Sequence, residues 1–331
     1  MKPSTIFYEE KTLEYELGKL LYDKFMDAQW IKIDSHNNIP TLRSNPNTEF
    51  PRMKQLLVIG IRKTHKYVEN HKVSDFLVPF TSSGCTAMCL YCYLVCNYNK
   101  CSYLRLFVNR EEMLNKLVKT TKKYEKDMTF EIGSNSDLVL ENSITGNLEW
   151  VIEEFGKYEK GFITLPTKFD MTHSLLHLNH RKRTIIRMSV NPNEIIKTIE
   201  LGTSTLLKRI QSINELCDAG YTVGLLIAPV ILIEHWKTHY LELLDILESN
   251  LTNKVKKEMF IEIIFMTYSY IHRMINKDAF PKAPELYHKE EMSGRGRGKY
   301  AYKKSMRDEG EMFLRKEIAK RFSEERILYI V

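Results

Sequence analysis

Several features of common protein classes are missing from this sequence. No uninterrupted apolar run is long enough to cross a bilayer, and the first residues lack the basic and then apolar layout of a signal peptide. No internal repeat is present. Six cysteines in 331 residues are too few for a disulfide framework. We therefore expect a protein of the reducing cytoplasm with no membrane partner.

The bulk composition is that of a folded globular protein. Apolar residues make up 43% and charged residues 27% of the chain, which is ordinary for this class. A length of 331 residues allows one large domain with extensions or two domains. The net charge of +7 permits an acidic partner such as nucleic acid, although a merely basic surface would give the same value.

Three of the cysteines lie close together, and the rest of the chain is organised around them. Cys85, Cys89 and Cys92 have the spacing C-x3-C-x2-C. Thiolates are soft ligands that repel one another unless a cation lies between them. Three of them can bind three irons of a four-iron cubane, whereas a ferredoxin would supply a fourth cysteine. The spacing, with Tyr91 before the last cysteine, predicts a [4Fe-4S] cluster whose open iron binds S-adenosylmethionine, as in radical SAM enzymes.

Zinc is the alternative ligand for this loop. Cys96 or Cys101 could then complete a set of four thiolates. A zinc knuckle, however, usually pairs two separated C-x2-C units, and the sequence has no second unit. The iron–sulfur interpretation is therefore preferred.

Strands and helices alternate from residue 76 onward. Hydrophobic periodicity predicts helices at 111–123, 148–158, 203–219 and 235–248. It predicts strands at 76–80, 128–132, 162–165, 184–190, 222–227 and 259–265. Six β/α units in series favour a parallel sheet, and the cysteine loop follows the first strand, where such sheets carry their sites.

The two ends of the chain read as additions to this α/β core. The N-terminal part is predicted to hold a helix at 13–25, strands at 31–33 and 56–61, and a loop at 34–49. The C-terminal part is predicted to hold a helix at 308–322 and a strand at 326–331. Before this helix, alternating Gly and Arg in residues 293–302 suit a hairpin tip that follows a nucleic-acid backbone, although a flexible basic loop has a similar composition.

The chain resembles the spore photoproduct lyase family, radical SAM enzymes of DNA repair. Residues 80–92 (FTSSGCTAMCLYC) carry the most specific part of the likeness. Further matching segments follow in the same order along the chain, at 57–64, 103–105, 167–169, 189–191, 202–204, 219–221, 228–230 and 298–302. The likeness therefore covers nearly the whole chain.

The resemblance implies a fold and a reaction. The fold is α/β, a partial (β/α)6 barrel at 76–266 with an N-terminal extension at 1–75 and a C-terminal segment at 267–331 that carries a DNA-contacting hairpin. The enzyme would cleave S-adenosylmethionine with an electron from its cluster. The resulting 5′-deoxyadenosyl radical would abstract hydrogen from C6 of the spore photoproduct, 5-thyminyl-5,6-dihydrothymine, and β-scission would then release two thymines.

The resemblance also implies roles for individual residues. The cluster ligands would be Cys85, Cys89 and Cys92. The residues that bind S-adenosylmethionine would be Ser136, Asp137, Lys168, Ser189 and, through its backbone, Ala228. The tyrosines that return hydrogen would be Tyr91 and Tyr93, and the residues that enter DNA and hold the flipped lesion would be Arg297, Lys299, Tyr300 and Tyr302.

One position departs from the family pattern. Ser134 stands where well-known members carry the cysteine that donates hydrogen to the product radical. A serine O–H bond is much stronger than a thiol S–H bond, so Cys96 and Cys101 become the alternative donors. The departure also leaves open an enzyme of the same architecture that acts on another lesion or nucleic-acid substrate, and a zinc-containing nucleic-acid-binding protein is a further alternative.

The resemblance finally implies partners and a setting. UV-damaged DNA would be the substrate, and flavodoxin or ferredoxin would be the reductant. We expect a monomer in the cytoplasm of a bacterial cell or in the spore core.

Overall fold

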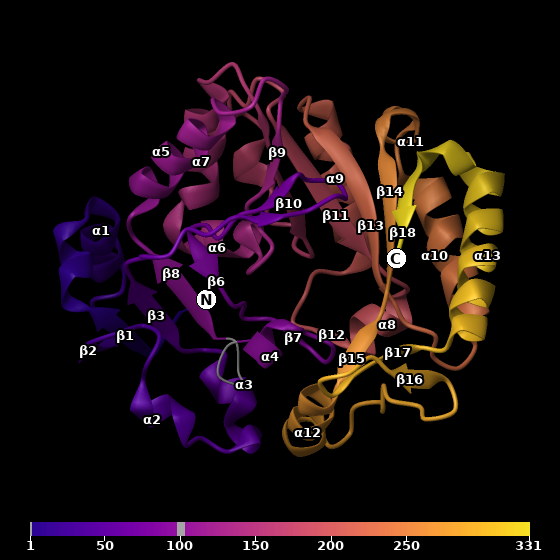
Figure 1. Cartoon of the computed structure of the whole chain (residues 1–331), viewed down its shortest axis with the longest axis horizontal. Helices are drawn as coiled ribbons and strands as arrows, with labels where there is room; N and C mark the ends of the chain where they lie inside the picture. The colour runs from indigo at the N-terminus through magenta and orange to yellow at the C-terminus, as the bar shows by residue number, and fades with distance from the viewer. Residues whose placement is uncertain (1, 98–102) are drawn as a thin grey trace. The chain divides into compact units, whose positions relative to one another are not determined.

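The computed structural model describes residues 2–97 and 103–331, whose elements can be followed in Figure 1. The chain divides into two compact units. The first comprises Met1–Met88, Leu94–Leu165 and Leu178–Thr184, and the second comprises Cys89–Tyr93, Pro166–His177 and Ile185–Val331. The cysteine loop passes from the first unit to the second between Met88 and Cys89.

The first unit begins with a sheet in the order β2-β1-β3-β8-β6. Its strands are β1 (Thr5–Glu9), β2 (Gln29–Ile33), β3 (Leu57–Gly60), β6 (Ser82–Ser83) and β8 (Leu104–Phe107). Strands β1, β2, β3 and β8 are parallel, and β6 joins β8 antiparallel. Apolar residues of these strands and of α1 (Glu16–Lys24), among them Ile6, Leu21 and Leu57, form one buried core. The sheet therefore anchors β6, which leads directly into Cys85.

The first unit also holds the strands β10, β9, β5 and β4, adjacent in that order. Their bounds are β4 (Val68–Glu69), β5 (Phe76–Leu77), β9 (Thr129–Glu131) and β10 (Phe162–Thr167), the last of which ends in the second unit. β9 is parallel to both β5 and β10. Besides α1, the helices of this unit include α2 (Pro40–Arg43), α3 (Phe50–Met53), α4 (Leu94–Asn97), α5 (Arg110–Thr121), α6 (Leu138–Thr145) and α7 (Asn147–Gly156).

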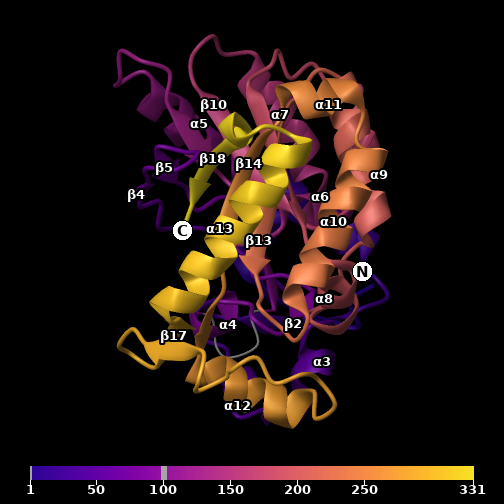
Figure 2. The same ribbon diagram turned by 90° about the vertical axis from the view of Figure 1, so that its right-hand side faces the viewer.

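The second unit is built on four parallel strands in the order β18-β14-β13-β11. These are β11 (Thr184–Val190), β13 (Thr222–Val230), β14 (Phe260–Phe265) and β18 (Ile327–Ile330). Its helices include α8 (Asn193–Thr198), α9 (Leu206–Asp218), α10 (Trp236–Asn250), α11 (Asn253–Glu258) and α13 (Lys304–Arg321). Figure 2 shows α10 and α13 side by side, joined by an edge-to-face contact of Trp236 with Phe313 and by an ion pair of Arg321 with Asp245.

A buried ion pair links the strands of the second unit. Arg187 of β11 places Nη1 3.2 Å from both carboxylate oxygens of Glu262 in β14, and Tyr329 of β18 donates its hydroxyl hydrogen to Glu262 Oε1 at 2.5 Å. A buried charge is costly unless it is paired, so this cluster favours one strand register.

A small antiparallel sheet completes the second unit. It has the order β15-β17-β16, with β15 (Thr267–Ser269), β16 (Met292–Gly294) and β17 (Lys299–Tyr302). Helix α12 (Tyr270–Ala279) follows β15 directly. Its first turn is closed by a capping box of Ser269 and His272.

Most predicted elements are confirmed, with small shifts at their ends. β11 has the predicted bounds, whereas the strand predicted at 76–80 is reduced to β5, and the loop predicted at 34–49 contains the short helix α2. Sequence periodicity missed β1, β8, α6, α8, α11 and α12. Several of these elements are too short for a helical or strand period to stand out. No helix in the described part of the chain is both long and apolar enough to span a membrane.

The Glu9 carboxylate forms several hydrogen bonds inside the first unit, and these give a prediction about stability in acid. Its carboxylate accepts hydrogen bonds from the backbone N–H groups of His36 and Ile61 at 2.9 and 3.0 Å, and it lies 2.8 Å from His36 Nδ1. Burial would raise the pKa of Glu9, but the hydrogen bonds outweigh it and lower the pKa from 4.5 to about 2. The carboxylate therefore stabilises the fold above pH 4.5, and this contribution is lost as the pH falls toward 2.

We expect Glu9→Gln to lower the free energy of unfolding by about 2 kcal/mol at pH 7. The difference from the wild type should shrink at pH 3.5. Urea unfolding at both pH values measures this, and Glu10→Gln is the matched control because Glu10 is exposed and only pairs with Lys32 at the surface. A deficit that is the same at both pH values would contradict the assignment.

Candidate active site

The carboxyl ends of neighbouring strands bring three predicted residues together in the second unit. Lys168 follows β10, Ser189 lies near the end of β11, and Ala228 lies near the end of β13. Lys168 Nζ donates hydrogen bonds to Ser189 Oγ at 2.5 Å and to the Ala228 carbonyl at 2.9 Å. The Ser189 hydroxyl also donates to that carbonyl at 3.0 Å. The Lys168 side chain is partly exposed.

Glu200 is the centre of this cluster, and sequence reasoning missed it. The side chain is fully buried at the start of β12 (Glu200–Leu201). Its carboxylate accepts hydrogen bonds from Lys168 and Tyr91 at 2.9 and 2.5 Å. It also accepts them from Asn191 and Arg209, each at 2.8 Å. The sequence around it, residues 197–201 (KTIEL), gives no signal of this role.

The charges around Glu200 keep it ionised. Burial would raise its pKa, but the cations of Lys168 and Arg209 and the hydrogen bonds from Tyr91 and Asn191 outweigh this effect. The pKa of Glu200 is therefore held well below its usual range. Because Arg209 is also fully buried, the ion pair is shielded from solvent.

Tyr91 connects this cluster to the segment that carries two of the cysteines. Its hydroxyl is bound to Glu200, and Lys168 Nζ lies 5.7 Å from the centre of its ring. Burial, and then the charges of Glu200 and Cys89, raise the pKa of Tyr91 well above its usual value. The neighbouring Leu90 is held by backbone contact with Ile199 at 3.0 Å. Cys89 and Cys92 are partly exposed, and Tyr93 is 53% exposed, which argues against a core-packing role for Tyr93.

In the first unit, Cys85 lies beside the turn that carries Ser134, Ser136 and Asp137. Ser136 Oγ lies 2.5 Å from Ser82 Oγ, and the Gly84 N–H donates to the Asn135 carbonyl at 2.8 Å. The positive φ of Gly84, 81°, suits glycine at this bend. Lys54 Nζ donates to the Cys85 carbonyl at 2.8 Å.

Asp137 begins helix α6. Its carboxylate accepts from the N–H groups of Val139 and Leu140 at 3.2 and 3.3 Å, so it acts as the N-cap. One turn later the buried Glu141 accepts hydrogen bonds from Thr145 and Asn147. Burial outweighs these bonds and raises the pKa of Glu141 to about 7. Its carboxyl group therefore titrates near neutral pH inside the first unit.

The predicted hairpin is present in the second unit, between β16 and β17. Gly296, Arg297 and Gly298 at its tip have positive φ, and the Lys299 N–H donates to the Gly296 carbonyl at 3.0 Å. Arg297 and Lys299 are exposed, and no carboxylate in the described part of the chain forms an ion pair with either. The partly exposed Tyr300 ring lies 4.6 Å from that of Tyr287.

Tyr302 requires a correction to the predicted set. It is only 3% exposed, and its hydroxyl oxygen accepts a hydrogen bond from the Leu232 N–H at 2.9 Å. Its ring lies edge-on to Phe265. A side chain packed in this way supports the hairpin and is not available to nucleic acid.

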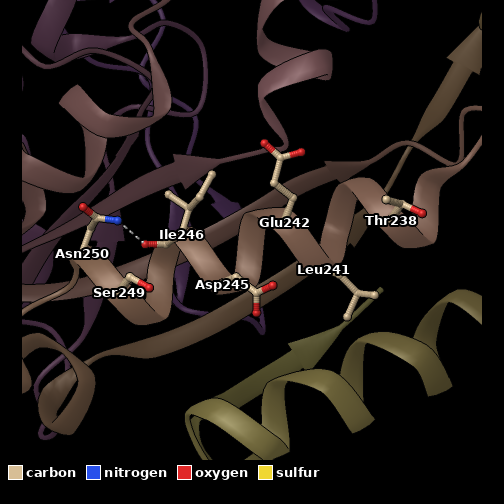
Figure 3. Close-up of a pocket in the computed structure, with 7 residues that line it drawn as sticks. All are labelled: Thr238, Leu241, Glu242, Asp245, Ile246, Ser249 and Asn250. Atoms are coloured by element: carbon tan, nitrogen blue, oxygen red, sulfur yellow. Dashed lines mark hydrogen bonds between the residues drawn. The ribbon is translucent and has the colours of Figure 1, made fainter.

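A cavity of about 440 Å3 lies apart from these residues, along α10. Figure 3 shows its lining, which includes Glu242 and Asp245. Two carboxylates make this surface a poor match for phosphate groups, and Asp245 is already bound by Arg321 of α13. We assign no part of the predicted site to it.

The donor set of the cysteine loop fits an iron–sulfur cluster. Cys85, Cys89 and Cys92 are all partly exposed, and thiolates are the usual ligands of such clusters. Within the described residues, no three His, Cys, Asp or Glu side chains gather around a single metal position. Cluster ligands bind different irons and need not converge in this way. Cys101 lies outside the described residues, and so does the side chain of Cys96.

The fold and the site define an α/β protein whose parallel strands carry polar residues at their carboxyl ends, beside a cysteine-bearing loop. A family model described as spore photoproduct lyase matches residues 1–331. A spore photoproduct lyase of Bacillus subtilis (strain 168) is 33% identical over 310 residues, which cover 91% of this chain and 90% of that protein. One from Clostridium acetobutylicum is 31% identical, with 98% of each chain covered. The chain belongs to the spore photoproduct lyase family, as its sequence predicted.

Solved structures give the same result for the fold. A spore photoproduct lyase complexed with dinucleoside spore photoproduct matches with a TM-score of 0.91 at 26% identity, over 99% of both chains. A mutant lyase with bound AdoMet and dinucleoside spore photoproduct matches with the same values. The predicted α/β partial-barrel fold is therefore confirmed, whereas the division at residues 75 and 266 stays a prediction.

The buried carboxylate gives a prediction about stability. We expect Glu200→Gln to lower the free energy of unfolding by about 3 kcal/mol, because it leaves the buried Arg209 without its counter-charge. Glu194→Gln, on the exposed face of α8, should change it by less than about 0.5 kcal/mol. Urea unfolding of both variants tests this, and equal stability would show that Glu200 does not organise the cluster.

Proposed function

We propose that this protein is a radical SAM lyase that repairs the spore photoproduct in DNA. One observation carries the proposal. Tyr91, in the Cys89–Cys92 segment, is hydrogen-bonded to Glu200, and Glu200 is in turn bound by Lys168, which also binds Ser189. This arrangement occurs in a chain that matches the family over its full length. The relatives that are solved with AdoMet and with dinucleoside spore photoproduct support the choice of cofactor and substrate.

In this proposal the cysteines bind the cluster and the polar residues bind S-adenosylmethionine. Cys85, Cys89 and Cys92 would hold a [4Fe-4S] cluster. Lys168 offers a cation for the carboxylate of S-adenosylmethionine, and Ser189 and the Ala228 backbone offer polar contacts beside it. Ser136 and Asp137 offer a hydroxyl and a carboxylate for its ribose and amino groups. When bound, these groups would supply the radical chemistry that acts at C6 of the lesion.

The hairpin would hold the damaged DNA. Arg297 and Lys299 provide exposed cations for phosphates, and Tyr300 provides an aromatic face for a base. An enzyme must take a base out of the stack to reach C6, which suits a hairpin that enters the duplex. We further propose that an external protein such as flavodoxin or ferredoxin supplies the electron. The enzyme would act as a monomer in a bacterial cell or in the spore core.

The return of hydrogen is the step in which this chain differs from the family pattern. The product radical must gain one hydrogen atom as a donor bond breaks, and the Ser134 O–H bond is too strong to serve readily. Cys96 and Cys101 are the candidate thiol donors, with Tyr91 and Tyr93 as the tyrosines that pass hydrogen onward. Ser134 also motivates the second candidate function, a lyase of the same architecture for another lesion, which would cleave S-adenosylmethionine without repairing spore photoproduct.

Metal analysis tests the proposed cluster. Anaerobically purified wild-type protein should contain about four irons per chain with matching sulfide. Cys85→Ala, Cys89→Ala and Cys92→Ala should each lose most of the iron, whereas Cys217→Ala should retain it because that thiol is buried in α9. Elemental and sulfide analysis measures this. Stoichiometric zinc without iron would favour the zinc alternative and remove the enzyme proposals.

The product distribution tests the hydrogen donor. With dinucleoside spore photoproduct, S-adenosylmethionine and dithionite, Ser134→Cys should raise the yield of repaired thymine relative to the wild type, because a thiol then stands in the turn. Ser143→Cys, which adds a thiol to the exposed side of α6, is the control and should change nothing. Cys96→Ala or Cys101→Ala should lower the yield if that thiol donates. No thymine from any of these proteins would contradict the proposed substrate.

A further inference from the structure

Helix α12 begins beside the hairpin tip. The Tyr270 N–H, at the first position of α12, donates to the Gly298 carbonyl at 3.0 Å. A side chain placed at Gly298 would meet the Tyr270 Cβ at 3.9 Å. The outer face of α12 therefore continues the surface of the hairpin.

This outer face has an unusual set of exposed side chains. Tyr270 is 56% exposed and Met274 is 40% exposed, and Lys277 is exposed one turn further on. The spacing of four and then three residues puts all three on one side of the helix. His272 and Ile275 occupy the opposite side and are buried. The face thus carries an aromatic ring and a lysine, with the exposed Asp278 at its edge, and it spans about 10 Å from Tyr270 to Lys277.

The charge of the region points to an anionic partner. Residues 267–303 contain eight Lys and Arg but only four Asp and Glu. Within the described chain, no carboxylate pairs with Lys277, Arg295, Arg297 or Lys299. Arg273 differs, because its Nε lies 3.0 Å from Glu285. Cations without counter-ions beside exposed aromatic rings are typical of surfaces that bind single-stranded nucleic acid.

The face is also held rigidly. Asn276 of α12 donates hydrogen bonds to the Leu90 carbonyl at 2.8 Å and to the Tyr268 hydroxyl at 3.0 Å. Leu90 lies between Cys89 and Tyr91, so the helix is fixed to the segment that carries two of the cysteines. A rigid support favours binding, because less conformational entropy is lost when the partner arrives.

We propose that the face of α12 formed by Tyr270, Met274 and Lys277 binds the DNA strand that flanks the lesion. This inference rests on the proposed function and extends it from the damaged pair to its neighbours. Phosphates on one strand of DNA are about 3.4 Å apart along the axis, so a face of about 10 Å spans about three nucleotides. A dinucleoside would not need this face.

The test measures DNA binding by the cluster-containing protein. Fluorescence anisotropy with a labelled, undamaged 12-nucleotide single strand gives the affinity at several salt concentrations. Lys277→Glu should weaken binding about tenfold at low salt and reduce the slope of log affinity against log salt by about one. Tyr270→Ala should weaken binding about fivefold or more and leave the slope unchanged, because stacking is not an ionic contact.

Lys257→Glu is the matched control, since Lys257 is an exposed lysine of α11 in the same unit. It should change the affinity less than twofold, and all variants should keep the far-UV circular dichroism of the wild type. The inference is overturned if Lys277→Glu and Tyr270→Ala bind like Lys257→Glu, or if Lys257→Glu weakens binding as much as they do.

Turnover of the dinucleoside lesion by the wild type separates this inference from the proposed function. Failure to release thymine would refute the proposed function whatever the binding data show. Normal turnover together with unaltered DNA binding by both α12 variants would refute the α12 surface alone.

Discussion

The second unit depends on a buried carboxylate that must remain charged. Burying Glu200 is costly, and only the two cations and the hydrogen bonds around it offset that cost. Each donor comes from a different part of the chain, namely Tyr91 from the cysteine segment, Lys168 from the end of β10, Asn191 from the end of β11 and Arg209 from α9. Because any displaced donor would leave a buried charge poorly compensated, these segments are held in one arrangement. The groups proposed to bind the cofactor are therefore ordered by the protein itself.

The first unit holds its share of the site in a different way. Here neutral contacts dominate, with Ser82 bound to Ser136 and the Gly84 N–H bound to the Asn135 carbonyl. Oδ1 of Asp137 accepts hydrogen bonds from the first turn of α6, which fixes the direction of the turn before the helix. These bonds bring Ser134 and Ser136 close to the start of the cysteine loop without burying a charge.

The sequence predicted the parts of the fold and site that depend on local pattern. The spacing of Cys85, Cys89 and Cys92 identified the cysteine loop, and the apolar run at 184–190 gave the bounds of β11. Both predictions succeeded because each signal is contained in a few adjacent residues. Glu200 could not be predicted, because its partners lie up to 109 residues away and its own segment is a two-residue strand. Tyr302 was misassigned for the opposite reason. It follows exposed hairpin residues in sequence, but its ring is buried beside Phe265 and its hydroxyl is bound to the Leu232 N–H.

Helix α12 links the hairpin proposed to bind DNA to the segment that carries two of the cysteines. Its first residue contacts the hairpin through the Gly298 carbonyl, and its Asn276 contacts Leu90 beside Cys89. The hairpin and the cysteine segment therefore keep a fixed separation as long as α12 stays folded, and its capping box stabilises the end nearest the hairpin. The proposed radical reaction would require the reacting atoms to lie within a few ångströms of each other, so an error in this separation would reduce its rate. A short rigid helix meets this requirement better than a flexible linker, because only the helix fixes the distance between the two contacts.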